Sequence, residues 1–302
     1  MVGDHLETDT TLAVVVQHRG EVVAEAYADG VTAGTTLISW SMAKSITHAL
    51  VGMAQMDGLL DVQAPTGITQ WQNDDRKHIT LQHLLEMRSG LAWIEDYVEG
   101  NESDVIEMLF GAGKDDHAAY AINQQLSSTP GSEWYYSSGT TNIISRLLGD
   151  ALGDKNGSHD KTHSFMQTRL FDAIGMASAT AQFDLVGTFV GSSYVYATAR
   201  DFAKFGELYL RDGIWDNKRV LPSGWVDHAR AQTVIDDETG QGYGAHWWTQ
   251  PGEPRSLIAS GYEGQQIFVL PERDLVIVRL GKTVAEKRAK VRKELFEIAQ
   301  LF

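Results

Sequence analysis

Two residues three positions apart, Ser41 and Lys44, carry the side chains that acyl transfer requires. A serine hydroxyl becomes a nucleophile when an adjacent base takes its proton, and Ser-x-x-Lys supplies both groups on one turn of a helix. The apolar run SITHALVGMAQM follows this pair, so we expect a helix that begins at Ser41. Packing against that run should lower the pKa of the Lys44 amine, which could then accept a proton.

The Ser-x-x-Lys pattern is not unique in the chain. Ser158 and Lys161 match it too, but Gly-rich and charged residues surround them, so a solvated loop is the better interpretation there. For Ser41 the alternative is a serine that only caps a helix while Lys44 points to water. A helix N-terminus at Ser41 would also supply free N–H groups and positive potential for one side of an oxyanion hole.

Two other segments place polar groups where a loop meets a regular element. Tyr136 precedes an apolar helical stretch, and its phenol could relay protons, although a turn with a capping Ser or Thr is the simpler interpretation. The segment 260–266 (SGYEGQQ) runs into the strand-like IFVL, and its two glycines permit close approach of a backbone or substrate. The N–H of Gln265 is therefore a candidate second oxyanion donor, with a plain glycine bulge as the alternative.

The elements that must position these residues can be predicted from the patterning. Residues 12–17 and 22–27 form one β-hairpin pattern, 266–270 and 275–280 form another, and an amphipathic helix is expected from about 284 to 300. Helical segments fill the middle. We predict an α/β (α+β) fold in which one antiparallel sheet is built from both termini and flanked by helices. The predicted sheet domain is 1–60 with 235–302, the mainly helical insertion domain is 61–234, and the active site lies in the cleft between them.

Composition excludes several classes of function. The chain of 302 residues has no cysteine, which rules out thiol catalysis, thiolate metal sites and disulfides. A formal net charge of −15 argues against nucleic-acid and membrane partners. Residues 1–8 show no secretion signal, so a cytoplasmic location is expected.

Other chemical motifs are absent or incomplete. Gly111 to Lys114 lack the remaining residues of a phosphate loop, and His159 and His163 lack the glutamate of a zinc motif. No G-x-S-x-G occurs, which argues against an α/β-hydrolase nucleophile elbow. We therefore predict a reaction that needs no metal and no cofactor.

In order and spacing, SMAK (41–44), YSS (136–138) and GYEG (261–264) resemble the three motifs of the serine β-lactamase-like superfamily. The resemblance is strongest to the class C-like branch, with its family VIII carboxylesterases and 6-aminohexanoate-dimer hydrolases, and it covers nearly the whole chain. It implies a β-lactamase/transpeptidase-like fold, with Ser41 as the acylated nucleophile and Lys44 as its proton partner. It further implies Tyr136 as a second general base or acid, and an oxyanion hole formed by the N–H groups of Ser41 and Gln265.

The chain departs from the superfamily pattern at two motifs. Ser138 stands where Asn is common, and Tyr262 and Glu263 stand where Lys or His and Thr are common. A carboxylate at Glu263 would repel the carboxylate of a β-lactam, so we expect a small ester, or an amide with a neutral or cationic neighbouring group. Substrate contacts are expected from Tyr262, Glu263, Gly264, Ser138 and Tyr194.

The sequence thus predicts a serine hydrolase that works through an acyl-enzyme. Two alternatives remain at this stage: β-lactam or D-alanyl peptide chemistry at the same residues, and a non-catalytic ligand-binding homologue. Relatives usually carry a helix before the first strand, which is expected here near Leu12, so a trimmed N-terminus also stays open. A homodimer is one of the oligomeric states left open.

Overall fold

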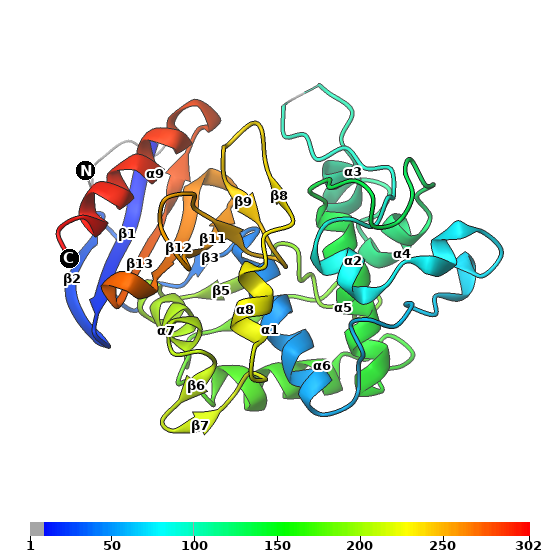
Figure 1. Cartoon of the computed structure of the whole chain (residues 1–302), viewed down its shortest axis with the longest axis horizontal. Coiled ribbons are helices and arrows are strands. Elements are labelled where there is room, and N and C mark those ends of the chain that lie inside the picture. The colour runs from blue at the N-terminus through cyan, green and yellow to red at the C-terminus, as the bar shows by residue number, and fades with distance from the viewer. Residues whose placement is uncertain (1–8, 99) are drawn as a thin grey trace.

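The computed structural model describes residues 9–98 and 100–302, and its main element is an eight-stranded antiparallel sheet (Figure 1). In spatial order the strands are β2 (Glu21–Tyr27), β1 (Asp9–His18), β13 (Leu275–Thr283), β12 (Gln265–Leu270), β11 (Leu257–Gly261), β10 (Trp248–Thr249), β9 (Gly242–Tyr243) and β8 (Val234–Ile235). β1 pairs with β13 from Asp9 opposite Thr283 to His18 opposite Leu275, so the two ends of the chain share one sheet. Both predicted hairpins, and the sheet built from both termini, are confirmed.

The central strands of the sheet are buried on both faces because a helix covers each face, whereas the edge strand β2 is exposed. Side chains alternate between the two faces of a strand, so Ile267 and Val278 join the core that includes α7 (Ala199–Leu210). Phe268 faces the other way and packs with Leu295 of α9 (Ala285–Ala299), the helix predicted from about 284 to 300. The two covered faces account for the nearly continuous apolar runs of β12 and β13.

The remainder of the chain is mainly helical, with short strands in two small sheets. The other helices are α1 (Met42–Met56), α2 (Leu81–Leu85), α3 (Asp104–Phe110), α4 (His117–Ile122), α5 (Ser138–Leu152), α6 (Asp160–Phe165), which continues into a π-helical turn (Met166–Phe171), and α8 (Trp225–Arg230). The small sheets contain β3 (Leu37–Ile38), β5 (Val195–Ala197) and β4 (Thr180–Ala181), and β6 (Ile214–Trp215) with β7 (Lys218–Arg219). Short 3-10 turns occur at Thr69–Trp71, Asp75–His78, Tyr262–Gly264 and Pro271–Arg273. Although α7 belongs to the segment 61–234, it packs against β1, β12 and β13, and the proposed domain division stays a prediction.

Helix α1 runs through the interior and fixes the position of the Ser-x-x-Lys pair. Every residue from Met42 to Ala54 is buried, and the helix contacts α5 on one side and β11 and β12 on the other. Its buried polar side chains have partners inside the protein, as Ser45 Oγ does in the His246 carbonyl 2.8 Å away. Its N-terminus therefore holds Ser41 and Lys44 where the sheet meets the helical part.

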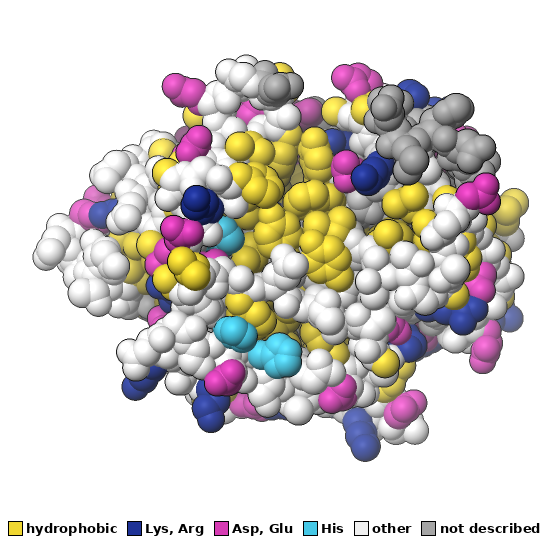
Figure 2. All heavy atoms as spheres, turned by 180° about the vertical axis from the view of Figure 1, so that it is seen from behind, with side chains coloured by type: hydrophobic (Ala, Val, Ile, Leu, Met, Phe, Trp, Pro, Cys, Tyr) yellow, Lys and Arg dark blue, Asp and Glu magenta, His cyan; other side chains and the backbone are white. Residues whose placement is uncertain are grey.

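Part of the outer surface is rich in apolar side chains (Figure 2). On the face opposite to that of Figure 1, apolar side chains form a band between the helical side and the sheet side of the molecule (Figure 2). Within the residues that the structure describes, no helix has the length and apolar character needed to cross a bilayer. The prediction for residues 1–8 lies outside the described residues, and the expected cytoplasmic location stays a prediction.

Candidate active site

The chain enters the candidate nucleophile through a left-handed residue. Trp40 has a φ of 44°, a region that non-glycine residues rarely adopt, and Ser41 follows with helical angles of −63° and −6°. The N–H of Ala43 already bonds to the Trp40 carbonyl, and α1 begins at Met42, one residue later than predicted. Backbone strain of this kind is often found at functional sites, where the surrounding structure enforces it.

Lys44 lies against Ser41 and has little contact with water. Its Nζ is 3.0 Å from Ser41 Oγ, 2.9 Å from Ser138 Oγ and 3.1 Å from the carbonyl oxygen of Ser192. The residue is 1% exposed. Burial lowers the pKa of Lys44 to about 8, against the charge of Glu95, which raises it. A lysine with this pKa has a neutral fraction near neutral pH and can accept the proton of a hydroxyl.

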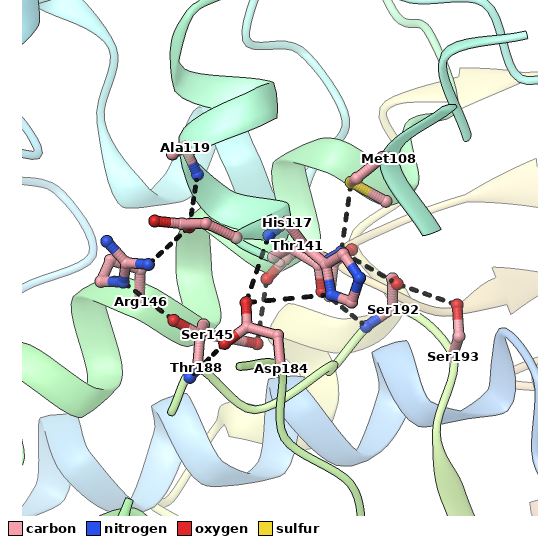
Figure 3. A network of polar contacts seen from close by, with 12 residues as sticks. Met108, His117, Ala119, Thr141, Ser145, Arg146, Asp184, Thr188, Ser192 and Ser193 are labelled. Atoms are coloured by element: carbon pink, nitrogen blue, oxygen red, sulfur yellow. Dashed lines mark hydrogen bonds and ion pairs between the residues drawn. The ribbon is translucent and has the colours of Figure 1, made fainter. Parts of the chain in front are cut away.

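The carbonyl that accepts from Lys44 is held by α5. Asn142 Nδ2 donates to Ser192 Oγ over 3.1 Å, and the Ser192 N–H donates to Asn142 Oδ1 over 3.3 Å. Figure 3 shows Ser192 beside Ser193, with 2.9 Å between the two hydroxyl oxygens. These contacts fix the loop, so the Ser192 carbonyl is a stationary acceptor for one N–H of Lys44.

Two neighbouring serines at the start of α5 have separate tasks. Ser137 is the N-cap, because its Oγ accepts a hydrogen bond from the Thr140 N–H over 3.1 Å. Ser138 is the first residue of the helix and turns its hydroxyl inward, to Lys44. The predicted catalytic segment therefore contains a capping serine and, directly after it, a serine that contacts the lysine.

Tyr136 completes the group around Lys44. Its ring centroid is 4.8 Å from Lys44 Nζ, and its ring stacks on Trp248 with centroids 5.7 Å apart. Removal from water and the charge of Glu95 raise the pKa of Tyr136 well above the usual range, while interaction with the Ser41 hydroxyl lowers it in part. The phenol is consequently protonated near neutral pH, which makes it a proton donor and leaves Lys44 as the available base.

Glu95, which the sequence reasoning missed, contacts this group from the loop between α2 and α3. Its Oε1 accepts hydrogen bonds from the hydroxyls of Ser138 and Tyr97, each over 2.6 Å. Its Oε2 accepts from the Ser138 N–H over 2.9 Å and from Trp93 Nε1 over 2.6 Å. Glu95 is 43 positions from Ser138, and no spacing rule connects the two, so the sequence offered no signal for this contact.

A cavity of about 360 Å³ contains Ser41 and Tyr136. Its other lining residues come from the sheet, from α9 and from loops: Tyr97, Glu238, Thr239, Gln241, Trp248, Ser260, Gly261, Tyr262, Gln266, Ala285, Arg288, Ala289 and Arg292. Tyr97 and Tyr136 belong to the segment 61–234, whereas the others belong to the two segments predicted to form the sheet domain. Of the predicted substrate contacts, Tyr262 lines the cavity.

The predicted oxyanion donor Gln265 is not among the residues that line this cavity. It is 2% exposed, faces Gly261 across the β11–β12 hairpin, and bonds through its side-chain amide to Gly281. Gly261 lies closer to the nucleophile, because a Cβ atom there would be 2.4 Å from the Ser39 carbonyl oxygen. Tyr262–Gly264 form a 3-10 turn between the strands, and β12 begins at Gln265, so the role of Gln265 as an oxyanion donor stays a prediction.

Comparisons with known proteins identify the family of this chain. A family model described as Beta-lactamase matches residues 7–300. The chain belongs to the Beta-lactamase family. It is 26% identical over 295 residues to the 6-aminohexanoate-dimer hydrolase of Paenarthrobacter ureafaciens, covering 91% of this chain and 73% of the relative.

Solved structures confirm the predicted β-lactamase/transpeptidase-like fold. One is a Bacillus anthracis protein provisionally named as a 6-aminohexanoate-dimer hydrolase, with a TM-score of 0.81 and 22% identity over 96% of this chain and 79% of that one. Another is a class C β-lactamase of Rhodobacter sphaeroides, with a TM-score of 0.71 and 16% identity over 96% and 94% of the two chains. This protein is therefore a hydrolase of the Beta-lactamase family.

In this member of the Beta-lactamase family, four predicted substrate contacts are not among the residues that line the cavity containing Ser41: Ser138, which contacts Lys44, and Glu263, Tyr194 and Gly264. Glu263 Oε2 accepts a hydrogen bond from Trp40 Nε1 over 3.2 Å, so its carboxylate is engaged by the protein. Tyr194 packs against Trp40 with ring centroids 5.9 Å apart. Gly264 has a φ of 79° and closes the hairpin turn. Glu263 does line the adjoining cavity, which shares Tyr262 and Arg288 with this one, so the expected repulsion between its carboxylate and an anionic substrate stays a prediction.

Proposed function

We propose that this protein is a serine hydrolase that cleaves a small ester or amide through an acyl-enzyme on Ser41. The observation that carries this proposal is the 3.0 Å contact between Lys44 Nζ and Ser41 Oγ at the wall of a cavity. The nearly complete burial of Lys44 supports its role as base, because the neutral amine is favoured there.

In the first step Ser41 Oγ attacks the carbonyl carbon of the substrate while Lys44 takes the hydroxyl proton. The oxyanion that forms would accept hydrogen bonds from the N–H of Ser41 and, in place of Gln265, from the N–H of Tyr262. We choose Tyr262 because it lines the cavity and follows Gly261, which packs against the Ser39 carbonyl. Two such donors are the usual requirement for stabilising a tetrahedral intermediate.

In the second part of acylation the carbon–heteroatom bond of the substrate breaks. The protonated Tyr136 donates its proton to the departing oxygen or nitrogen, and the proton held by Lys44 replaces it. A water molecule then attacks the acyl carbon and gives one proton to this pair of residues. Collapse of the intermediate returns a proton to Ser41 and releases the carboxylic acid.

The substrate class includes amides as well as esters. The Paenarthrobacter relative is named for the hydrolysis of 6-aminohexanoate dimer, which is joined by an amide bond. The amine that departs from an amide is a poor leaving group unless it is protonated, so proton donation by Tyr136 should matter more for amides than for activated esters.

Hydrolysis of β-lactams or D-alanyl peptides is a second candidate, and one observation favours it. Arg288 and Arg292 of α9 line the cavity that contains Ser41, and guanidinium groups are good partners for a substrate carboxylate. Arg288 also lies over the Tyr262 ring, 4.6 Å from its centroid. A chromogenic cephalosporin should therefore be tested beside the esters.

The proposal can be tested with p-nitrophenyl butyrate under rapid mixing. We expect a burst of p-nitrophenol close to one equivalent of enzyme, followed by slower turnover, because acylation precedes deacylation. Ser41→Ala should lose both phases. Ser158→Ala, which changes the other serine in a Ser-x-x-Lys pattern, should keep both. Unaltered turnover in Ser41→Ala would overturn the proposal, and a wild-type protein inert to esters, amides and cephalosporins would favour a non-catalytic homologue.

A further inference from the structure

We propose that Glu95 is a positioning residue which, through the Ser138 hydroxyl, directs the lone pair of Lys44 at Ser41. This inference rests on the proposed function, because it concerns how the base of that reaction is oriented. It assigns a role to a carboxylate outside the three sequence motifs. The argument comes from counting the hydrogens that each group in the network can donate.

The first step concerns the Ser138 hydroxyl, which has one hydrogen to donate. Ser138 Oγ is 2.6 Å from Glu95 Oε1, and the backbone nitrogen of Ser138 is 2.9 Å from Glu95 Oε2. The carboxylate of Glu95 therefore accepts two hydrogen bonds from Ser138. All four groups around Glu95 donate to it, which fits an ionised carboxylate that can only accept. The Ser138 hydrogen is therefore committed to Glu95.

The second step concerns Lys44. Because the Ser138 hydroxyl already donates its hydrogen to Glu95, Ser138 Oγ can only accept a hydrogen bond from Lys44 Nζ, which is 2.9 Å away. The Ser192 carbonyl, 3.1 Å from the same nitrogen, is also an acceptor by its chemistry. A neutral amine has two N–H groups and one lone pair, so both N–H groups are used on these acceptors. The lone pair then points at the third neighbour, Ser41 Oγ, at 3.0 Å.

The third step concerns the charges that face Lys44. Among the described residues, Glu95, Tyr136 and His246 are the titratable groups that interact with it. Burial lowers the pKa of His246 to about 3 and raises the pKa of Tyr136, so both are neutral near pH 7. Glu95 is left as the charge that acts on Lys44, and it raises the pKa of the lysine. Glu95 thus aims the base and also offsets part of the decrease that burial causes in the pKa of Lys44.

The local structure explains why Glu95 can hold this position. Its loop is anchored to α3, because the Ile94 N–H donates to Asp104 Oδ2 over 2.7 Å and the Asp104 N–H donates to the Ile94 carbonyl over 2.9 Å. Trp93 is 6% exposed and points its indole N–H at Glu95. The carboxylate is therefore fixed before a substrate arrives, as a positioning residue requires.

The test compares Glu95→Gln with Asp96→Asn, which removes one negative charge from the same loop without touching Ser138. In Glu95→Gln an NH2 group, which donates, replaces one of the two carboxylate oxygens that accept hydrogen bonds. The Ser138 hydroxyl is then no longer required to donate to residue 95 and can turn its hydrogen toward Lys44. We expect the plateau of kcat/KM for p-nitrophenyl butyrate to fall by about tenfold or more. We also expect the acidic limb of the pH profile to move down by about 1 pH unit, because the charge that raises the pKa of Lys44 is gone. Asp96→Asn should change neither.

A merely structural role for Glu95 would lower the amount of folded enzyme without moving the acidic limb. Rates are therefore normalised to the fraction of enzyme that reacts with a fluorophosphonate. A limb at the wild-type pH in Glu95→Gln, or a wild-type plateau, would overturn the inference. If Glu95→Gln does not fold, Ser138→Ala serves as the second variant, and a plateau within twofold of wild type there would overturn it as well. If the wild type shows no turnover, the proposed function itself has failed.

Discussion

Trp40 Nε1 donates a hydrogen bond to Glu263 Oε2 over 3.2 Å, and the bond joins residues that are 223 positions apart. Trp40 directly precedes Ser41, and Glu263 lies in the turn between β11 and β12. Both residues have positive φ, 44° and 59° respectively. The bond therefore ties together two strained turns that flank the proposed oxyanion hole.

Loss of this bond should slow the reaction. Glu263→Leu leaves the indole N–H of Trp40 unpaired at a half-buried position, which destabilises this arrangement of the two turns by roughly 1 kcal/mol. Because the two turns flank the oxyanion hole, we expect kcat to fall several-fold with little change in KM. Glu263→Gln keeps an acceptor oxygen and should stay within about twofold of wild type. Steady-state kinetics on p-nitrophenyl butyrate measures both. Equal losses in the two variants would contradict a role for the hydrogen bond.

Gly261 should not tolerate a side chain. A Cβ atom there would lie 2.4 Å from the Ser39 carbonyl oxygen, so either β11 or the segment before Ser41 must move. Catalytic geometry is sensitive to such shifts, and we expect Gly261→Ala to reduce kcat/KM by about a hundredfold. Gly34→Ala is the matched control, because Gly34 has ordinary space around it. Wild-type activity in Gly261→Ala would show that the close approach is not needed.

The wild-type pH profile should identify the base. Since burial lowers the pKa of Lys44 to about 8, kcat/KM should rise with pH through an apparent pKa near 8 and then level off. Tyr136→Phe should lower the plateau but keep this limb, because the raised pKa of Tyr136 makes it an acid in the free site. Disappearance of the limb in Tyr136→Phe would instead make the tyrosine the base.

Buried histidines should make the protein unstable in acid. His48, His228 and His246 are held neutral by burial, which lowers the pKa of His228 to about 4 and that of His246 to about 3. Between pH 6.5 and about 4 these histidines bind protons in the unfolded chain but not in the folded protein. The stability that depends on these neutral histidines is therefore fully present above pH 6.5 and is lost as the pH falls. Each such proton changes the free energy of unfolding by about 1.4 kcal/mol per pH unit.

Urea unfolding at several pH values measures this loss. His228→Gln should reduce the slope of unfolding free energy against pH, because one of the three groups is gone. His78→Gln removes an exposed histidine and is the control for loss of an imidazole in general. An unfolding free energy that does not change between pH 7 and pH 5 would contradict the account.

Local sequence patterns were sufficient to predict features formed by residues that are close together in the chain. The hairpins were predictable because short apolar runs rich in β-branched residues bracket short turns, and Ser41 with Lys44 because both lie on one helical turn. Glu95 was missed because its contact with Ser138 depends on two loops that meet only in the folded chain. The start of β12 at Gln265 agrees with the apolar pattern, but the 3-10 turn at Tyr262–Gly264 before it could not be predicted, because apolar patterning does not report such a turn.

The charge at Glu263 illustrates a second limit. The sequence shows a carboxylate in a motif that usually binds a substrate anion, but the direction of its side chain is set by Trp40, far away in the sequence. Arg288 and Arg292 reach the cavity from the C-terminal helix, which was predicted from its amphipathic pattern without any residue assigned to the site. Both features follow from tertiary packing, so neither could be derived from local spacing.

Covalent acylation of Ser41 adds a defined mass to the chain, which intact-protein mass spectrometry detects. Wild type and Ser41→Ala are incubated with a fluorophosphonate and with p-nitrophenyl butyrate, and any adduct is mapped by peptide analysis. The account predicts one adduct per chain on wild type, located at Ser41 and absent from Ser41→Ala. An adduct at another residue, or none on a folded wild-type protein, would contradict it.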